Sequence, residues 1–287
     1  MFVLFPDFVL LKSGSDRMRK IKMLAVDMDG TCLDRRSRMT DRTLRALEES
    51  AKAGVIVVPA TGRCLSCLPH RLRERKDIYR YVITSNGARI IDCLGQKLLS
   101  EKLIDKETAL ALLERSKRAG VGITAHIDHE YFVQGKALSA AGRVMFGKDA
   151  QAIRHVAEMR NAVQKAADAI EEIQFYFLKP GSREKTKRIL EEFPQLSGAY
   201  TKIYAEIFAK QTSKGDALKE LAGYLGIREE EVACIGDGEN DLPMFEAAGL
   251  RMAMGNAVPE LKKKAEYILP ANDKNGAAEG IYRYILS

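Results

Sequence analysis

Two aspartates one residue apart follow an apolar segment near the start of the sequence. Asp27 and Asp29 stand directly after the residues MLAV, in the stretch IKMLAVDMDGTCLD. A carboxylate at the end of a buried strand is costly unless a cation or a reacting group completes its surroundings. Gly30 lets the chain turn sharply without placing a side chain beside the acids. The stretch therefore indicates a site that binds a cation, performs chemistry, or does both.

Further polar residues follow three other segments that read as strands. They are Thr61, Ser85 and Asn86, and the group of Asp237, Asn240 and Asp241. Ligands of an open parallel α/β sheet bind outside the carboxyl ends of its strands, so we expect these groups to converge on one crevice. Several carboxylates in one pocket repel one another unless a hard cation lies among them. An all-oxygen set of ligands suits Mg²⁺.

A metal ion alone leaves two of the candidate residues unexplained. Thr61 offers a hydroxyl group, and Lys214 opens a predicted helix in the stretch TSKGDAL. A hydroxyl, a lysine and free amides at a helix N-terminus together form a phosphate site. The acid pair, Mg²⁺ and a phosphate site indicate phosphoryl transfer.

The elements that must position these residues alternate between strand and helix. Residues 21–27 predict a buried parallel strand, and Thr40 or Asp41 caps a helix that ends at Gly54. A second apolar strand follows at once, which makes a βαβ unit with a parallel sheet. Similar patterns predict further elements, namely a helix over 65–76, a strand over 81–88, helices over 213–227, 242–249 and 276–286, and strands in 231–241 and 250–257.

The middle of the chain has a different pattern. Residues 88–104 predict a hairpin, and they are followed by helices near 106–119 and 150–169 and strands near 121–133, 171–178 and 199–208. This mixture predicts an α+β domain inserted into the parallel one. The expected organisation is an N-terminal extension over 1–20, a catalytic core over 21–87 and 210–287, and the inserted domain over 88–209.

Four motifs in order resemble those of the haloacid dehalogenase superfamily. They are DMDGT at 27–31, ATGR at 60–63, SKG at 213–215 and GDGEND at 236–241. With SNGA at 85–88 and a long insertion before Lys214, the spacing is similar to that of Cof-type phosphatases, whose C2-type cap domain lies between the second and third motifs. The resemblance covers nearly the whole chain after residue 20. It implies a doubly wound, Rossmann-like parallel sheet with an inserted α+β cap.

The resemblance also implies roles for the two paired aspartates. Asp27 would be the nucleophile that forms an aspartyl-phosphate intermediate. Asp29 would protonate the leaving alkoxide and then activate water, acting as acid and base in turn.

The same resemblance implies the ligands of the metal ion and of the phosphoryl group. Mg²⁺ would bind the Asp27 carboxylate, the Asp29 main-chain carbonyl and Asp237, while Asp241 would support the metal shell or orient Lys214. Asp241 could equally cap the helix beginning near Pro243. The phosphoryl oxygens would be held by Thr61, the amides of Met28 and Gly62, Lys214 and Asn240.

Composition restricts the partners and the location. The 287 residues carry a net charge of +7, but the basic residues are scattered and no aromatic-rich basic strip is present. We therefore expect neither nucleic acid nor membrane as partner, and the resemblance implies a small phosphorylated metabolite. The first 17 residues lack the features of a signal peptide. The sequence does not indicate an oligomeric state.

Two short patterns permit other interpretations. Five cysteines form no framework, which suits reduced thiols in a cytoplasmic protein, and the Cys64/Cys67 pair reads as two ordinary helix thiols more readily than as a redox or zinc site. HIDHE at 126–130 looks like a metal cluster, but its place in the inserted domain favours exposed strand residues or an edge that faces the substrate.

The predicted function is a Mg²⁺-dependent phosphatase that hydrolyses phosphate monoesters of small metabolites, such as sugar phosphates or phosphorylated cofactors. Two alternatives remain. A phosphomutase would return the phosphoryl group to a sugar, and a non-catalytic module would bind phosphorylated metabolites without turning them over.

Overall fold

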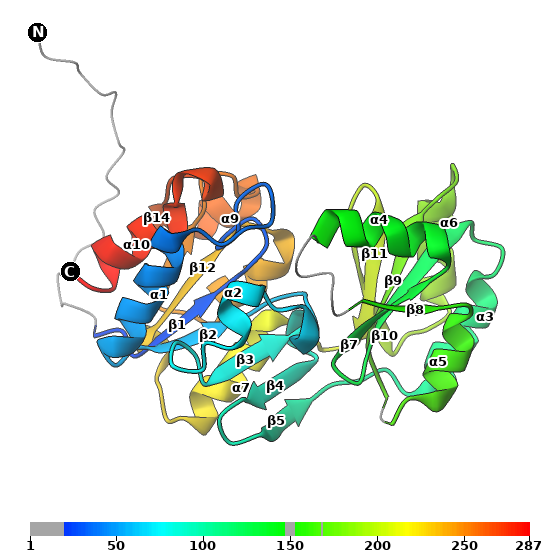
Figure 1. Ribbon diagram of the computed structural model, residues 1–287, viewed down its shortest axis with the longest axis horizontal. Coiled ribbons are helices and arrows are strands. Elements are labelled where there is room, and N and C mark those ends of the chain that lie inside the picture. The colour runs from blue at the N-terminus through cyan, green and yellow to red at the C-terminus, as the bar shows by residue number, and fades with distance from the viewer. Residues whose placement is uncertain (1–19, 147–152, 168) are drawn as a thin grey trace, which may run out of the picture.

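The computed structural model describes residues 20–146, 153–167 and 169–287, so the predicted N-terminal extension lies outside it except for Lys20. Figure 1 shows two lobes side by side: the first and last parts of the chain form one lobe, and the middle of the chain forms the other.

The first lobe is built on a parallel sheet of five strands in the order β14-β13-β12-β1-β2. These strands are β1 (Met23–Val26), β2 (Ile56–Pro59), β12 (Val232–Gly236), β13 (Leu250–Ala253) and β14 (Tyr267–Ile268). Strand β1 is central and pairs with both neighbours, Met23 lying opposite Val232 and Ile56. All four of its residues are buried, which explains the uninterrupted apolar run that precedes Asp27. The parallel α/β core is confirmed.

Helices flank this sheet. They are α1 (Asp41–Lys52), α7 (Lys214–Tyr224), α8 (Leu242–Phe245), α9 (Pro259–Lys264) and α10 (Gly276–Tyr284), with short 3₁₀ turns η4 (Glu229–Glu231), η5 (Glu239–Asp241) and η6 (Asn272–Lys274). The Thr40 hydroxyl accepts a hydrogen bond from the Thr43 amide and caps α1, as the sequence predicted.

The predicted helix over 65–76 is wrong. A 3₁₀ turn, η1 (Leu65–Cys67), is followed by the four-residue helix α2 (His70–Arg73). Pro69 stands between the two with a non-helical ψ of 128°. Proline has no amide hydrogen to donate and disfavours helical geometry in the residue before it, so the two turns do not merge.

A small antiparallel sheet of three strands joins the first lobe. It contains β3 (Tyr81–Thr84), β4 (Arg89–Asp92) and β5 (Lys97–Glu101), with the turn η2 (Ser85–Gly87) between β3 and β4. Ile90 and Ile91 of β4 pack in the same hydrophobic cluster as β1, whereas the cluster of the second lobe begins with Ile104. We therefore propose that the inserted domain begins after Glu101 instead of at residue 88.

The second lobe contains a sheet of six strands in the order β10-β11-β9-β6-β7-β8. The strands are β6 (Val121–Ile127), β7 (Glu130–Gln134), β8 (Ile153–Val156), β9 (Ile170–Phe177), β10 (Leu196–Tyr200) and β11 (Tyr204–Ala209). The accompanying helices are α3 (Lys106–Ser116), α4 (Lys136–Phe146), α5 (Met159–Lys165) and α6 (Ser182–Glu191).

Three sequence predictions in this lobe need correction. The segment 121–133 is a hairpin, because Asp128 and His129 adopt positive φ angles of 50° and 68° and reverse the chain. The segment 199–208 overlaps the β10–β11 hairpin instead of a single strand. The predicted helix over 150–169 is too long, because residues 153–156 pair with β7 as a parallel strand and only α5, Met159–Lys165, is helical in its described part.

None of the helices in the described residues combines the length and the apolar character needed to cross a bilayer.

Candidate active site

A hollow of about 350 Å³ lies where the two lobes meet. The first lobe lines it with Asp27, Asp29, Ser37, Gly62, Arg63, Cys67, Asp237, Gly238 and Asn240. The second lobe lines it with His126, Tyr131, Gln174, Tyr176, Ile203, Tyr204 and Glu206. Polar residues that follow three different parallel strands therefore share one space with side chains of the inserted segment.

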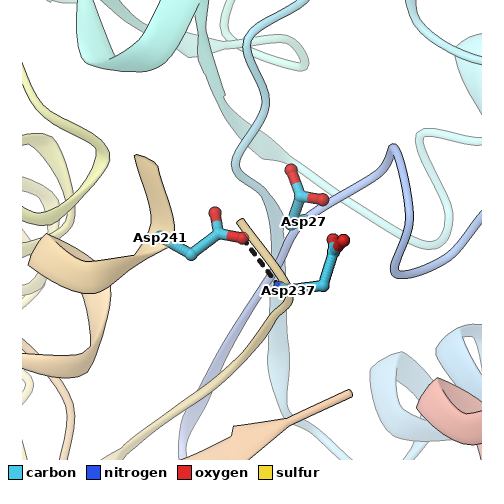
Figure 2. Close-up of side chains that lie close together, drawn as sticks. All are labelled: Asp27, Asp237 and Asp241. Carbon is cyan, nitrogen blue, oxygen red and sulfur yellow. Dashed lines mark hydrogen bonds between the residues drawn. The ribbon is translucent and has the colours of Figure 1, made fainter. Parts of the chain in front are cut away.

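Three aspartates meet at the first-lobe side of the hollow. Asp27 follows β1, Asp237 follows β12, and Asp241 ends η5; one oxygen of each lies within 4.8 Å of the others. Figure 2 shows the three carboxylates turned toward a common space. Burial, offset in part by Lys214, raises the pKa of Asp27 well above its ordinary value. Burial and the neighbouring Asp241 raise the pKa of Asp237 to about 6.

Lys214 supplies the buried positive charge of this cluster. Its Nζ donates hydrogen bonds to Asp27 Oδ1 at 2.6 Å and to Asp241 Oδ1 at 2.7 Å. Burial alone would lower the pKa of Lys214, but Asp241 and Asp27 raise it above its ordinary value. Lys214 is the first residue of α7, whose N-cap Ser213 accepts a hydrogen bond from the amide of Asp216. The helix start thus fixes the direction of the lysine.

Asp241 has both of its carboxylate oxygens engaged. Oδ1 accepts from Lys214, and Oδ2 accepts from the backbone amides of Asp237 at 2.9 Å and Gly238 at 3.0 Å. Its side chain makes no capping bond to α8, so the helix-cap alternative is not supported. Asp241 orients Lys214 and holds the loop that carries Asp237.

Asp29 points into the hollow and is held by an arginine that the sequence reasoning missed. Arg63 donates to both oxygens of Asp29, from Nε and Nη2, each at 2.7 Å. The Arg63 side chain is only 5% exposed, and its Nη1 donates to the Cys67 carbonyl at 3.0 Å. A planar guanidinium held on both sides fixes the carboxylate in orientation as well as in position. The sequence did contain an indication of this residue, because Arg63 is the last residue of the ATGR motif.

Two further residues that the sequence analysis did not identify orient Asp237. Thr31 Oγ1 donates to its Oδ1 at 2.9 Å, and Asn256 Nδ2 lies 3.2 Å from its Oδ2. Gly30 has a φ of 84°, and a Cβ added there would lie 2.3 Å from Asp237 Oδ2. Glycine is therefore required at this turn for its backbone angle and for the close approach of the carboxylate.

The predicted phosphate ligands fall into two groups. Gly62 and Asn240 line the hollow, whereas the side chains of Met28, Thr61 and Lys214 lie behind it, each at most 1% exposed. The Met28 side chain is part of the hydrophobic core, so its backbone amide alone could serve a ligand. The Thr61 hydroxyl accepts from the Arg63 amide at 3.1 Å, which leaves its own proton available for an oxygen acceptor.

Asn86 joins the two lobes next to this group. Its Oδ1 accepts from Asn240 Nδ2 at 3.0 Å. Its Nδ2 donates to Glu172 Oε2 at 2.9 Å and to Glu206 Oε2 at 3.1 Å. Asn86 has a φ of 55°, a conformation that asparagine adopts more readily than most residues. The stretch SNGA therefore carries contacts that connect a predicted phosphate ligand to the second lobe.

The histidines and cysteines singled out from the sequence lie in different surroundings. His126 is only 3% exposed, so the expectation of an exposed strand residue is wrong for it, but it does line the hollow. The His129 amide donates to Glu171 Oε1 at 2.7 Å. Cys64 and Cys67 are buried, and all five cysteines are free thiols.

The donor set of the cluster fits a hard divalent cation. Asp27 and Asp237 present carboxylate oxygens to the same space, and the three carboxylates of the cluster outnumber the Lys214 ammonium that is bonded to two of them. Oxygen ligands with an excess of negative charge are what Mg²⁺ binds in proteins. Asp241, with both oxygens already bonded, fits the supporting role better than that of a direct ligand.

Comparison with known protein sequences shows likenesses along nearly the whole chain. The profile of a family described as haloacid dehalogenase-like hydrolase matches residues 24–281. Phosphatase YwpJ of Bacillus subtilis is 30% identical over 282 residues, covering 90% of this chain and 98% of that protein. The 5-amino-6-(5-phospho-D-ribitylamino)uracil phosphatase YwtE of the same species is 28% identical over 284 residues, covering 90% and 96%.

This chain is also similar to solved structures over most of its length. The structure of BT4131, a sugar phosphatase of HAD subclass IIB, matches with a TM-score of 0.77 at 25% identity and covers 92% of this chain and 98% of that one. The match includes both lobes, since 92% of the chain cannot be covered by either lobe alone.

Proposed function

Because this chain belongs to the haloacid dehalogenase-like hydrolases, as its four motifs predicted, and is a phosphoric monoester hydrolase, we propose that it hydrolyses phosphate monoesters of small metabolites with Mg²⁺ through an aspartyl-phosphate intermediate. One observation carries the proposal: Asp27, bonded to Lys214, shares a hollow with Asp237 and with an Asp29 that Arg63 holds in place.

In the first step, an oxygen of Asp27 attacks phosphorus and the bond from phosphorus to the ester oxygen breaks. Asp29 gives its proton to the departing alkoxide. The buried ammonium of Lys214 favours the carboxylate form of Asp27 and opposes the effect of burial on its pKa. The amides of Met28 and Gly62, the Thr61 hydroxyl and Asn240 would receive the negative charge that spreads over the phosphoryl oxygens.

In the second step, Asp29 takes a proton from a water molecule, which attacks the phosphorus of the aspartyl phosphate. The bond from phosphorus to the Asp27 oxygen breaks, and inorganic phosphate leaves. Arg63 holds Asp29 toward the hollow for both proton transfers. The second lobe supplies the opposite wall and limits the access of bulk water.

Asp27, Asp237 and the Asp29 main-chain carbonyl are the groups that would hold Mg²⁺, with Asp241 in support. When bound there, the ion would screen the anionic nucleophile from the anionic substrate and withdraw charge from the phosphoryl group.

The substrate class is proposed from similarity and from the size of the hollow. BT4131 is named a sugar phosphatase and YwtE a phosphatase of a ribitylaminouracil phosphate, and both names describe small hydroxylated metabolites. A space of about 350 Å³ suits a leaving group of that size. The five free thiols support the cytoplasmic location proposed from the sequence.

The test of this function measures inorganic phosphate released from p-nitrophenyl phosphate and from a panel of phosphorylated metabolites in the presence of Mg²⁺. We expect turnover of the aryl ester and of at least one metabolite. A hexose monophosphate converted to its isomer without phosphate release would support the phosphomutase alternative. Binding of phosphate esters without release or isomerisation would support the non-catalytic module.

The Arg63–Asp29 contact leads to a prediction about acid catalysis. Arg63→Lys keeps the positive charge but loses the two parallel hydrogen bonds that orient Asp29. We expect kcat/KM, which reports the step that releases the alcohol, to fall by about 10²-fold for alkyl phosphates, whose alkoxide needs a proton, and clearly less for p-nitrophenyl phosphate, whose leaving group does not. Equal losses for both esters would contradict the positioning role. Arg75→Lys, at an exposed ion pair with Asp77, serves as the control.

A further inference from the structure

The second-lobe wall of the hollow lies opposite the carboxylates of the first lobe. His126 of β6, Tyr131 of β7, Gln174 and Tyr176 of β9, and Tyr204 and Glu206 of β11 form most of it. With the phosphoryl group at Asp27, the leaving group must lie against this wall. The hydrogen-bonding side chains of this wall therefore decide which phosphate esters fit. This inference rests on the proposed function.

The hydroxyl groups of the wall donate hydrogen bonds to other protein groups. Tyr131 donates to Gln174 Oε1 at 3.0 Å, and Tyr176 lies 3.4 Å from the same oxygen. Gln174 is held in this orientation because its Nε2 donates to Glu172 Oε1 at 2.6 Å. These phenol protons are thus directed into the wall and away from a ligand.

His126 offers an acceptor. Ser85 Oγ donates its single proton to Glu171 Oε2 at 2.7 Å, and the same Oγ lies 3.0 Å from His126 Nδ1. His126 Nδ1 must therefore carry the hydrogen of this second contact. Burial lowers the pKa of His126 to about 4, so the ring is neutral at pH 7 and its Nε2 has a free lone pair.

Glu206 offers the second and stronger acceptor. It shares the Asn86 amide with Glu172, at 3.1 Å and 2.9 Å, and two carboxylates on one donor repel each other. Burial raises the pKa of both acids, and it raises that of Glu172 well above its ordinary value. Glu172 is fully buried, whereas Glu206 lines the hollow. Glu206 receives hydrogen bonds from Asn86 and Tyr204, and such donors favour the negatively charged carboxylate.

The Glu206 carboxylate has capacity left for a ligand. Asn86 occupies one position on Oε2, and the Tyr204 side chain is bonded to the carboxylate as well. A carboxylate accepts about four hydrogen bonds, so about two positions remain.

From this geometry we infer that Glu206 is a specificity-determining residue that accepts hydrogen bonds from hydroxyl or amino groups of the leaving group. The site then takes phosphate esters of neutral polyols and sugars, or of amino sugars, and discriminates against esters whose leaving group carries a carboxylate. A second anion on the substrate would face the charge of Glu206, and the buried cations Arg63 and Lys214 of the first lobe are bonded to aspartates. Such like-charge contacts are strongly unfavourable.

The first experiment compares kcat/KM of the wild-type protein for glucose 6-phosphate, glucosamine 6-phosphate and 2-phosphoglycolate. We expect the better of the two hexose esters to exceed phosphoglycolate by about 10²-fold or more, because a lost hydrogen bond and a repulsive contact act together. A ratio of the two hexose esters near one identifies hydroxyl donors as the recognised groups. A clear preference for glucosamine 6-phosphate identifies the amino group.

The second experiment removes the acceptor. Glu206→Ala should lower kcat/KM for the preferred hexose ester by about 10- to 100-fold, mainly through KM. Glu206→Gln should retain part of that activity and raise kcat/KM for phosphoglycolate by about 3- to 10-fold, because the repulsion is gone. A purely structural role for Glu206 would not produce this gain. Glu130→Gln, at an exposed ion pair of β7 with Arg154 outside the hollow, should keep the wild-type ranking.

Two outcomes would overturn the inference: equal turnover of hexose and carboxylate esters by the wild type, or a Glu206→Gln variant with unchanged selectivity. Calorimetric titration of the Asp27→Asn variant with the same three esters in Mg²⁺ gives the ranking without turnover. If no ester is hydrolysed but the ranking holds, the proposed function fails and the inference stands. If esters are hydrolysed without the ranking, only the inference fails.

Discussion

Asp27→Asn is expected to abolish turnover of p-nitrophenyl phosphate, with a loss in kcat on the order of 10⁴-fold or more, because the amide oxygen is a poor nucleophile toward phosphorus. The fold should persist. Asparagine has nearly the same shape, Lys214 keeps its 2.7 Å bond to Asp241, and a carboxylate whose charge is disfavoured by burial is removed. The measurements are phosphate release and thermal unfolding of the same preparation.

The control for this variant is an aspartate that does not line the hollow. Asp77→Asn removes an exposed ion pair with Arg75 and should leave kcat within about twofold of the wild type. A mass increase of one phosphoryl group, trapped on the wild type by rapid acid quench and absent from Asp27→Asn, would locate the intermediate. Retained turnover by Asp27→Asn would assign the nucleophile to another residue.

Removal of divalent ions should also inactivate the enzyme. With a chelator in excess, we expect kcat to fall by about 10²-fold or more, because the charge of Asp27 and Asp237 then repels the phosphate ester. Mg²⁺ should restore activity. Ca²⁺ should restore little of it, since its longer bonds and looser coordination suit this site poorly. Full activity in the chelator would contradict the metal requirement.

The pKa of Asp237 gives this prediction a second measurement. In the metal-free fold its pKa is raised from 3.8 to about 6 by burial and by Asp241. The folded state therefore binds the proton more tightly than the unfolded state. The contribution of this protonation to the free energy of unfolding is fully present below the pKa that Asp237 has in the unfolded state. It is lost as the pH rises through about 6. Mg²⁺ competes with the same proton, so the thermal stabilisation by a fixed Mg²⁺ concentration should increase from about pH 5 to about pH 7.5. A constant or opposite trend would argue against Asp237 as a ligand.

Much of the core could be predicted because its signals are local. Strand β1 is an apolar run whose burial on both faces follows from the parallel sheet, and Asp27 comes directly after it. The helix α1 begins at a capping threonine, and α7 begins at Lys214. Where strands are parallel neighbours, residues after their carboxyl ends must share one edge, so strand order alone brings Asp27 and Asp237 together.

The second lobe was harder to predict from the sequence because its strands depend on pairing with strands that are distant in the chain. Residues 153–156 are a strand because they pair with β7, and nothing in their own pattern separates a short strand from a helix. Pro69 divides a predicted helix in two. The start that we propose for the inserted domain, after Glu101, depends on a distant contact as well, since the β3–β4–β5 sheet packs on the core through Ile90 and Ile91.

The sequence by itself determined the chemistry: an acid pair at the end of a buried strand, a lysine at a helix start, and a third acid after a late strand. These are properties of short segments, and the parallel sheet needs no further information to align them. Only the tertiary structure decided how the acids are held and what faces them. Arg63 meets Asp29 across 34 positions, and Asn86 meets Glu206 across 120. Such contacts depend on side-chain directions after folding, which no local pattern specifies.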